Sequence, residues 1–157
     1  MNKNSWIKLI IWIITFELIG FSLSIMTEAN IHSWYEGLNK SILTPPGFVF
    51  SIVWSILYVL LAIAGWMIWQ KRENIEMRPA LYLYISQLLM NWAWTPLFFQ
   101  LHLIGYSLIW LLIMTFLTLL TIYSIKNKEK LVIYLLVPYF IWLIFATYLN
   151  YAIWLLN

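Results

Sequence analysis

Residues 47–69 read GFVFSIVWSILYVLLAIAGWMIW, and no charged side chain interrupts them. A helix needs roughly 20 consecutive apolar residues to cross the hydrocarbon core of a bilayer. Four further stretches have this length and character, so the sequence predicts an all-α integral membrane protein. We expect a bundle of five transmembrane helices in one domain, residues 1–157, with spans at about 6–26, 47–69, 80–101, 105–125 and 131–156.

The composition excludes several classes of protein. Of the 157 residues, 64% are hydrophobic and 10% are charged, which is incompatible with a soluble single domain. There is no cysteine, so disulfides, thiolate nucleophiles and cysteine-ligated metals are excluded. No catalytic triad, phosphate-binding glycine loop or paired carboxylate site is recognisable. The net charge of +3 comes from residues that flank the spans, so we expect no nucleic-acid partner and no metal.

The basic residues predict how the chain is oriented. Eight of the nine Lys and Arg residues lie near the N-terminus or in the connections 70–79 and 126–130, and only Lys40 lies on the opposite side. Cytoplasmic connections carry an excess of Lys and Arg. We therefore expect a plasma-membrane protein, if bacterial, with the N-terminus in the cytoplasm and the C-terminus outside. The apolar run 7–25 is long for a cleaved signal peptide, so we expect the first span to remain.

The connection 27–46 is unusual because it is long and contains Trp34 and Tyr35. Solvated linkers are polar, so aromatic residues here favour a folded lid over the outer end of the bundle. The alternative is an interfacial segment that rests on the lipid headgroups.

Polar and aromatic residues inside the spans recur at positions i, i+4 and i+8, which places each set on one helix face. Because hydrocarbon cannot satisfy polar groups, these faces should point into the bundle. From their depth, the faces converge in the outer half, beneath the long connection. This pattern is typical of a lidded pocket, although helix packing with amide hydrogen bonds explains it equally well. The sets are Gln87, Asn91 and Thr95 with Trp94 and Phe98 beside them; Trp142, Ala146 and Asn150; and Phe50, Trp54 and Tyr58.

Few ionisable groups lie within the spans. Glu17 stands in the middle of the first, and a protonated acid bonded to a neighbouring helix is favoured over a functional carboxylate. Without a chain of buried acids and bases, a proton pump or ion-coupled transporter is disfavoured. His32 and His102 fall in outer connections, where solvated histidines are commoner than metal or haem ligands.

Four strings within residues 34–150 are shared with a known family. They are Trp34-Tyr35-x-x-Leu38-Asn39-Lys40; Pro45-Pro46-x-x-Val49-Phe50-x-x-x-Trp54-x-x-Leu57-Tyr58; Gln87-Leu88-x-x-Asn91-x-x-Trp94-Thr95-Pro96-x-Phe98-Phe99; and Val137-Pro138-Tyr139-x-x-Trp142-x-x-x-Ala146-x-x-x-Asn150. In order and spacing they resemble the translocator protein family, also called tryptophan-rich sensory proteins or peripheral-type benzodiazepine receptors.

The resemblance implies a homodimeric five-helix bundle that binds porphyrins and synthetic ligands beneath its first loop. Animal members carry a cholesterol motif in the fifth helix, a Tyr followed shortly by Lys or Arg. Here no basic residue follows Tyr148 or Tyr151, so cholesterol binding by that route is not expected. By motif match, the pocket would be lined by Tyr35, Trp54, Asn91, Trp94, Trp142 and Ala146, and Pro45, Phe50, Phe98 and Asn150 complete the candidate set.

Three functions remain open at this point. A receptor or stress sensor for porphyrins, or tetrapyrroles generally, is favoured. The second is light- and oxygen-dependent breakdown of bound porphyrin, with Trp54 and Trp142 as catalytic electron donors, so enzymatic activity stays undecided. The third is a transporter of tetrapyrroles or sterol-like molecules. In each case porphyrin is ligand or substrate and no cofactor is expected, and Lys40 is the cation expected near the porphyrin propionates.

Overall fold

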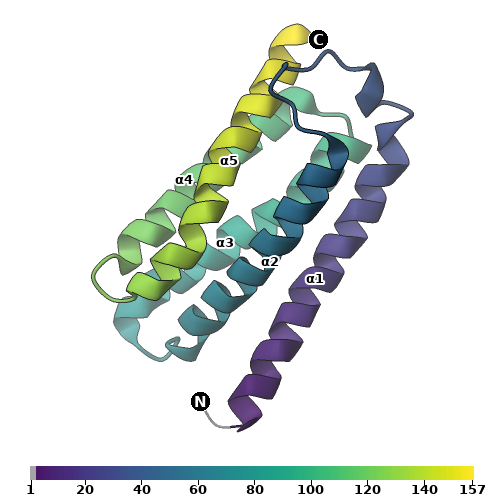
Figure 1. Ribbon diagram of the computed structural model, residues 1–157. Coiled ribbons are helices and arrows are strands. Elements are labelled where there is room, and N and C mark those ends of the chain that lie inside the picture. Colours follow the sequence, from purple (N-terminus) through teal and green to yellow (C-terminus); the bar gives the residue numbers. More distant parts are fainter. Residues whose placement is uncertain (1–2) are drawn as a thin grey trace.

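The computed structural model describes residues 3–157, with side chains from residue 5 onward. This part of the chain is all-helical (Figure 1). The long helices lie side by side, and the connection between the first two crosses one end of the bundle, near the C-terminus. They are α1 (Lys3–Ile31), α2 (Gly47–Gln70), α3 (Arg78–Thr95), α4 (Ile104–Ile125) and α5 (Lys130–Leu156); short turns are η1 (Tyr35–Gly37), η2 (Ile75–Met77) and the π-helical turn η3 (Pro96–Gln100).

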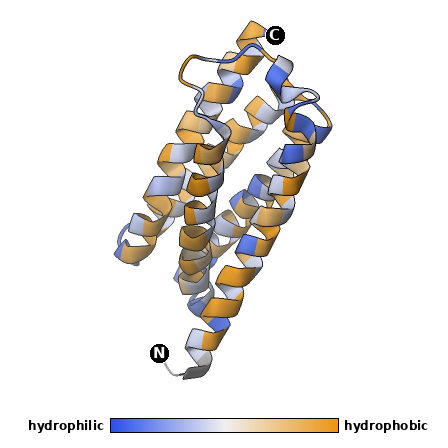
Figure 2. Ribbon diagram, turned by 45° about the vertical axis from the view of Figure 1, so that its right-hand side comes forward, coloured by the Kyte–Doolittle hydropathy of each residue, from blue (hydrophilic) through white to orange (hydrophobic). Residues whose placement is uncertain are grey.

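The predicted number of helices is confirmed, but only four qualify as membrane spans by length and composition: α1, α2, α4 and α5. Figure 2 shows hydrophobic residues along the helices and hydrophilic ones mostly at the connections. The exception, α3, has 18 residues and includes Arg78, Gln87 and Asn91. Its last turn continues directly into η3, which lengthens the rod. That α3 crosses the membrane remains a prediction.

The first connection is shorter than expected, because α1 continues to Ile31 instead of ending near residue 26. Polar side chains in the extra turn bond back onto the helix. The hydroxyl of Thr27 donates to the Leu23 carbonyl (3.1 Å) and the amide of Asn30 to the Met26 carbonyl (3.0 Å). These residues thus satisfy their own polar groups within the helix. The expected lid loop 27–46 is therefore reduced to a segment of residues 32–46.

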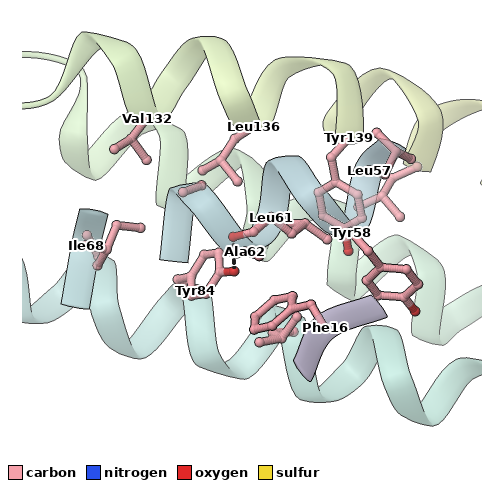
Figure 3. Packing of buried hydrophobic residues seen from close by; sticks show 14 of the residues in the cluster. Phe16, Leu57, Tyr58, Leu61, Ala62, Ile68, Tyr84, Val132, Leu136 and Tyr139 are labelled. Carbon is pink, nitrogen blue, oxygen red and sulfur yellow. Dashed lines mark hydrogen bonds between the residues drawn. The ribbon is translucent and has the colours of Figure 1, made fainter. Parts of the chain in front are cut away.

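The helices form a ring in which α1 packs on α2, α2 on α5, α5 on α4 and α4 on α3, with α3 returning to α1. Leucine, isoleucine and tyrosine side chains fill the centre, as seen around Leu61, Leu136 and Tyr139 in Figure 3. Helix α1 is the least embedded member, because Phe16 is its one buried side chain among those described. The core thus belongs mainly to α2–α5.

Two glycines allow close approach within the subunit. A Cβ atom on Gly20 of α1 would lie 2.6 Å from the ring of Tyr58 in α2. A Cβ atom on Gly65 would lie 2.6 Å from the hydroxyl of Tyr84, which donates a 2.6 Å hydrogen bond to the carbonyl of Leu61 (Figure 3). Small residues here let aromatic rings lie directly against a neighbouring backbone, as is common between membrane helices.

Candidate ligand site at the loop end

Asn91 lies at the centre of a buried polar link between three helices. Its Oδ1 accepts a 3.1 Å hydrogen bond from the Tyr58 hydroxyl of α2, and its Nδ2 donates one of 3.1 Å to the Tyr139 hydroxyl of α5. Only 4% of Asn91 is exposed. Both ends of the amide are therefore engaged within the protein. Of the two explanations for the polar residues inside the spans, Asn91 fits helix packing through amide hydrogen bonds.

Aromatic rings pack together where η3 meets the segment 32–46. We call Trp34, Tyr35, Trp94, Phe98 and Phe99 the loop-end cluster. Phe98 is at its centre: it stacks on Trp94 (centroids 5.0 Å apart, planes at 15°) and meets Tyr35 at 6.2 Å and Trp34 at 5.2 Å. The burial of Tyr35 raises the pKa of its hydroxyl, which keeps it neutral. The segment 32–46 is thus a packed cover rather than a solvated linker.

The remaining aromatic candidates form a second group, on α2 and α5. Phe50 meets Trp142 edge-on at 5.8 Å, and Trp54 lies 6.4 Å from the ring of Tyr139. All are half-buried except Tyr139, which is fully buried. Tyr139 also bonds to Asn91, so this group and α3 meet at one point, as the spacing had predicted.

Three buried polar groups near these clusters have no protein partner among the described residues. They are the indole N–H groups of Trp94 and Trp142 and the Oδ1 atom of Asn150. The Nδ2 atom of Asn150 is engaged, since it donates to the Ile104 carbonyl of α4 at 3.0 Å. Two donors and one acceptor are therefore available to a bound molecule, if the rings around them part. An unsatisfied buried polar group is costly, so such groups are enriched where ligands bind.

Lys40 does not serve as the free cation that the sequence suggested. Its Nζ donates to the carbonyls of Tyr35 (2.8 Å), Glu36 (3.1 Å) and Leu38 (2.7 Å). The ammonium also lies 4.9 Å from the centre of the Tyr35 ring. In this structure the three donors of Lys40 hold the η1 turn, and its proximity to ligand carboxylates stays a prediction.

The segment 32–46 is also tied to the end of α5. The Asn39 amide N–H donates to Oδ1 of Asn157 (2.9 Å), and Nδ2 of Asn157 donates back to the Asn39 carbonyl (3.0 Å). A second contact joins the hydroxyls of Ser41 and Tyr148 at 2.8 Å. These bonds fix the position of the cover on α5. Because they are exposed to solvent, breaking them to open the cover costs little free energy.

The histidines and Glu17 take structural positions. The His32 ring nitrogen lies 3.0 Å from the Glu36 carboxylate, and the His102 ring stacks on Trp34 at 4.0 Å. Within residues 3–157 no three potential metal ligands come together. Glu17 has one buried carboxylate oxygen without a partner, on the face of α1 towards the bundle. Neither histidine is placed to hold a metal.

The aromatic candidates pack against one another, and no candidate residue lines either of two cavities found elsewhere in the described chain. One cavity, of about 550 Å³, lies at the opposite end between α1, α2 and α3. The other, of about 320 Å³, lies between α4 and α5. Pro45 and Ala146 are half-buried, and Ala146 packs against the central core. At the loop end, the rings of Tyr35, Trp94 and Phe98 therefore contact one another.

The candidate set left out four contributors: Trp34, Tyr58, Phe99 and Tyr139. Tyr58 already stood on the predicted face of Phe50 and Trp54, and Tyr139 lies one turn before Trp142, so helical spacing identifies both. Phe99 lies next to the candidate Phe98 in the sequence. Trp34 could have been found from its position next to Tyr35. The stack of Trp34 on His102 gave no sequence signal, because the two residues lie in different connections.

Comparison with known proteins agrees with this architecture. The chain is 34% identical over 151 residues to the tryptophan-rich protein TspO of Archaeoglobus fulgidus, covering 96% of this chain and 97% of that protein. It is 35% identical over 123 residues to the translocator protein of Homo sapiens, with 77% and 73% covered. The tryptophan-rich sensory protein of Cereibacter sphaeroides is 33% identical over 124 residues, with 79% and 77% covered.

The characteristic sequence pattern of the TspO/MBR family matches residues 9–155, which is nearly the whole chain. The matched region includes the loop-end cluster, the polar link at Asn91 and the four apolar helices. On this evidence the protein is an integral, multi-pass membrane protein and belongs to the TspO/MBR family.

Proposed function

We propose that this protein is a membrane receptor or sensor that binds porphyrins and similar flat apolar ligands at the loop end. The observation that carries this proposal is a group of three of the unpartnered buried atoms on α3 and α5: the two indole N–H groups of Trp94 and Trp142, and Oδ1 of Asn150. A porphyrin has carboxylates that accept such hydrogen bonds and ring N–H groups that donate. Tryptophan faces supply the apolar contact area that its ring requires.

Binding requires the cover to open, because the rings of Tyr35, Trp94 and Phe98 now fill the site with contacts of 5.0–6.2 Å. The ligand would replace ring–ring contacts by ring–ligand contacts and leave the core of α2–α5 intact. Tyr35→Ala should therefore speed porphyrin dissociation more than it slows association. If stopped-flow fluorescence gives equal porphyrin dissociation rates for Tyr35→Ala and the parent protein, the segment 32–46 does not cover the ligand.

The decisive experiment is the absorbance of protoporphyrin titrated with purified protein in darkness. A saturable spectral shift is expected, and no shift would overturn the proposal. Trp142→Phe should weaken binding by on the order of 1 kcal/mol, because one hydrogen bond to the ligand is lost. Trp154→Phe is the matched control, since Trp154 lies on the same helix with 52% of its surface exposed. That variant should bind as the parent does.

A second candidate function is the light- and oxygen-dependent breakdown of bound porphyrin. It is favoured by the surroundings of Trp54, whose ring lies 5.7 Å from Tyr58 and 6.4 Å from Tyr139. An indole that gives an electron to photoexcited porphyrin would have two phenols nearby from which to recover it. Bleaching under light and oxygen, lost in both Trp54→Phe and Trp142→Phe while dark binding survives, would establish this function. Flux of porphyrin into sealed vesicles would instead indicate transport.

The orientation and assembly are part of the same proposal. We expect the N-terminus in the cytoplasm, the segment 32–46 outside, and a plasma-membrane location in a bacterial host. Because the chain has no cysteine, Ser33→Cys should be labelled by an impermeant maleimide in intact cells and Asn127→Cys should not. The reverse pattern would place the site on the cytoplasmic side. A homodimer is also expected, and light scattering of the detergent-solubilised protein measures it.

A further inference from the structure

A cavity separate from the loop-end cluster lies between the first half of α1, the last turns of α2 and residues 81–92 of α3. Its volume is about 550 Å³, within the range of small-molecule sites. Along α1 it extends from Lys8 to Phe16, a distance of about 12 Å from the helical rise. Exposed residues of α1 and α3, Thr15 and Leu89 among them, form its rim, so it opens to the surface between these helices.

The wall of this cavity is aromatic, and its rings pack directly against one another. Trp12 stacks on Phe16 at 27° with centroids 5.9 Å apart, Trp12 meets Trp66 at 59° and 5.9 Å, and Phe16 meets Trp92 at 73° and 5.8 Å. With their centroids this close, no two of these rings leave room for a flat ring system between their faces. A flexible hydrocarbon chain, by contrast, can follow a surface of tilted rings. The geometry therefore suits a chain better than a porphyrin.

Hydrogen bonding in the wall is incomplete without a ligand. The indole N–H groups of Trp12, Trp66 and Trp92 are buried and have no acceptor among the described residues. Trp66 is 91% buried, as only 9% of its surface is exposed. Three donors of one kind around one cavity favour an occupant that carries acceptor oxygens, such as an ester or phosphate.

Two basic residues lie at or next to this cavity in the sequence of its helices. Lys8 lines the cavity, and Arg78 precedes the lining residue Leu81 by one turn of α3. Neither has an ion pair within the described chain. Their neighbours are already engaged: Lys71 pairs with Glu129 and Arg72 with Glu73. Two uncompensated positive charges beside a cavity between membrane helices match an anionic lipid headgroup.

From these features we propose that the cavity between α1, α2 and α3 is a second binding site, which takes one acyl chain of an anionic phospholipid. Lys8 and Arg78 hold the headgroup, the acyl chain follows the aromatic wall, and the ester oxygens meet the indole donors. The bilayer supplies the ligand directly through the opening between α1 and α3. This site is independent of the loop-end site, so either can fail without the other.

The test uses phosphatidylglycerol with a photoreactive diazirine in its acyl chain, and phosphatidylcholine with the same chain as the comparison. After illumination of the purified protein, peptide mass spectrometry locates the label. We expect phosphatidylglycerol to label the segments 8–16 and 81–92 roughly tenfold more than phosphatidylcholine, the preference that two basic groups supply. Equal labelling by the two lipids, or label spread evenly over all exposed helix faces, would overturn the proposal.

Matched variants separate this site from general lipid contact. Thr15→Phe fills the rim and should abolish the label, whereas Thr115→Phe in the other cavity should not. Both hydroxyls donate to the carbonyl four residues earlier, at 2.9 and 2.7 Å, so the two changes remove the same local bond. Leu89→Phe, on the opposite rim, repeats the test on another helix. Unchanged label in Thr15→Phe and Leu89→Phe would overturn the proposal.

Charge variants test the headgroup. The double variant Lys8→Gln, Arg78→Gln should lower phosphatidylglycerol labelling to the level of phosphatidylcholine. The control is the double variant Lys126→Gln, Lys130→Gln, in the connection between α4 and α5 and at the start of α5, which should leave the labelling unchanged. If both double variants lose phosphatidylglycerol labelling to the same extent, the lipid preference comes from the general surface charge and the proposal is overturned. Displacement of the label by protoporphyrin, or cross-links between protomers through this face, would assign the cavity to another occupant and overturn the proposal.

Discussion

At the loop end, Trp94 and Phe98 stack at 5.0 Å beneath a cover, whereas at the basic end the rings of α1, α2 and α3 leave a cavity of about 550 Å³. Both ends are aromatic, so composition does not explain the difference. The cover is held by Lys40 and by the bonds between Asn39 and Asn157, whereas the aromatic rings that line the cavity of α1, α2 and α3 have three indole N–H groups without an acceptor among the described residues. Aromatic residues close a site only where backbone and polar contacts hold their helices together.

The largest effect on stability is expected at Gly65, where α2 packs closely against Tyr84 of α3. In Gly65→Ala the new Cβ atom would meet the buried Tyr84 hydroxyl at 2.6 Å and displace it from the Leu61 carbonyl. We expect a loss of about 2 kcal/mol of stability, typical of overpacking. Thermal unfolding in detergent measures it. Gly47→Ala is the control, because nothing lies within 4 Å of a Cβ atom there. Similar melting temperatures for the two variants would show that Tyr84 yields freely.

A smaller effect is expected at the polar link between the two ends. Asn91→Leu removes the partner of both Tyr58 and Tyr139 and should cost about 1–2 kcal/mol, since hydrogen bonds between membrane helices average about 0.6 kcal/mol each. A double-mutant cycle with Tyr139→Phe isolates one bond. If the two changes are strictly additive in unfolding measurements, Asn91 and Tyr139 are not coupled.

The smallest effect is expected at the exposed tie of the cover. Asn157→Ala removes the acceptor of the Asn39 N–H and should cost about 0.5 kcal/mol of global stability, because exposed hydrogen bonds contribute little. Hydrogen exchange is the sensitive readout: the Asn39 amide should exchange faster while amides of α2 stay protected. Asn127→Ala, in the exposed turn after α4, is the control. Unchanged exchange at Asn39 would show that Ser41 and Tyr148 hold the cover alone.

Much of the helical bundle was predictable because hydrophobic runs separated by charged connections are a strong signal. The end of α1 was not, since Thr27 and Asn30 look like loop residues until their side chains bond back to the helix. Similarly, α3 combines Gln87 and Asn91 with apolar residues, which makes it the weakest span by composition. Such polar residues are tolerated because the neighbouring helices supply partners.

The candidate site was predictable in its helix faces and not in its contacts. The fourfold spacing predicted that Asn91, Trp54 and Trp142 lie towards one region, and Tyr139 contacts two of them: its ring lies 6.4 Å from that of Trp54 and its hydroxyl accepts a hydrogen bond from Asn91. Spacing could not reveal that both ends of the Asn91 amide are already engaged, or that Lys40 caps a turn. These depend on tertiary partners. The cavity at the basic end also escaped prediction, because aromatic residues at helical spacing describe a packed interface and an open one equally well.

The single buried side chain of α1 has a consequence for biogenesis. Chains are synthesised from the N-terminus, so α1 enters the membrane before α2–α5. A span that relied on buried contacts would wait in lipid with its interior face unsatisfied. Helix α1 is long and apolar enough to cross a membrane, so its insertion does not depend on contacts with the other helices. It can therefore anchor the nascent chain first, and α2 joins it later through the close contact at Gly20.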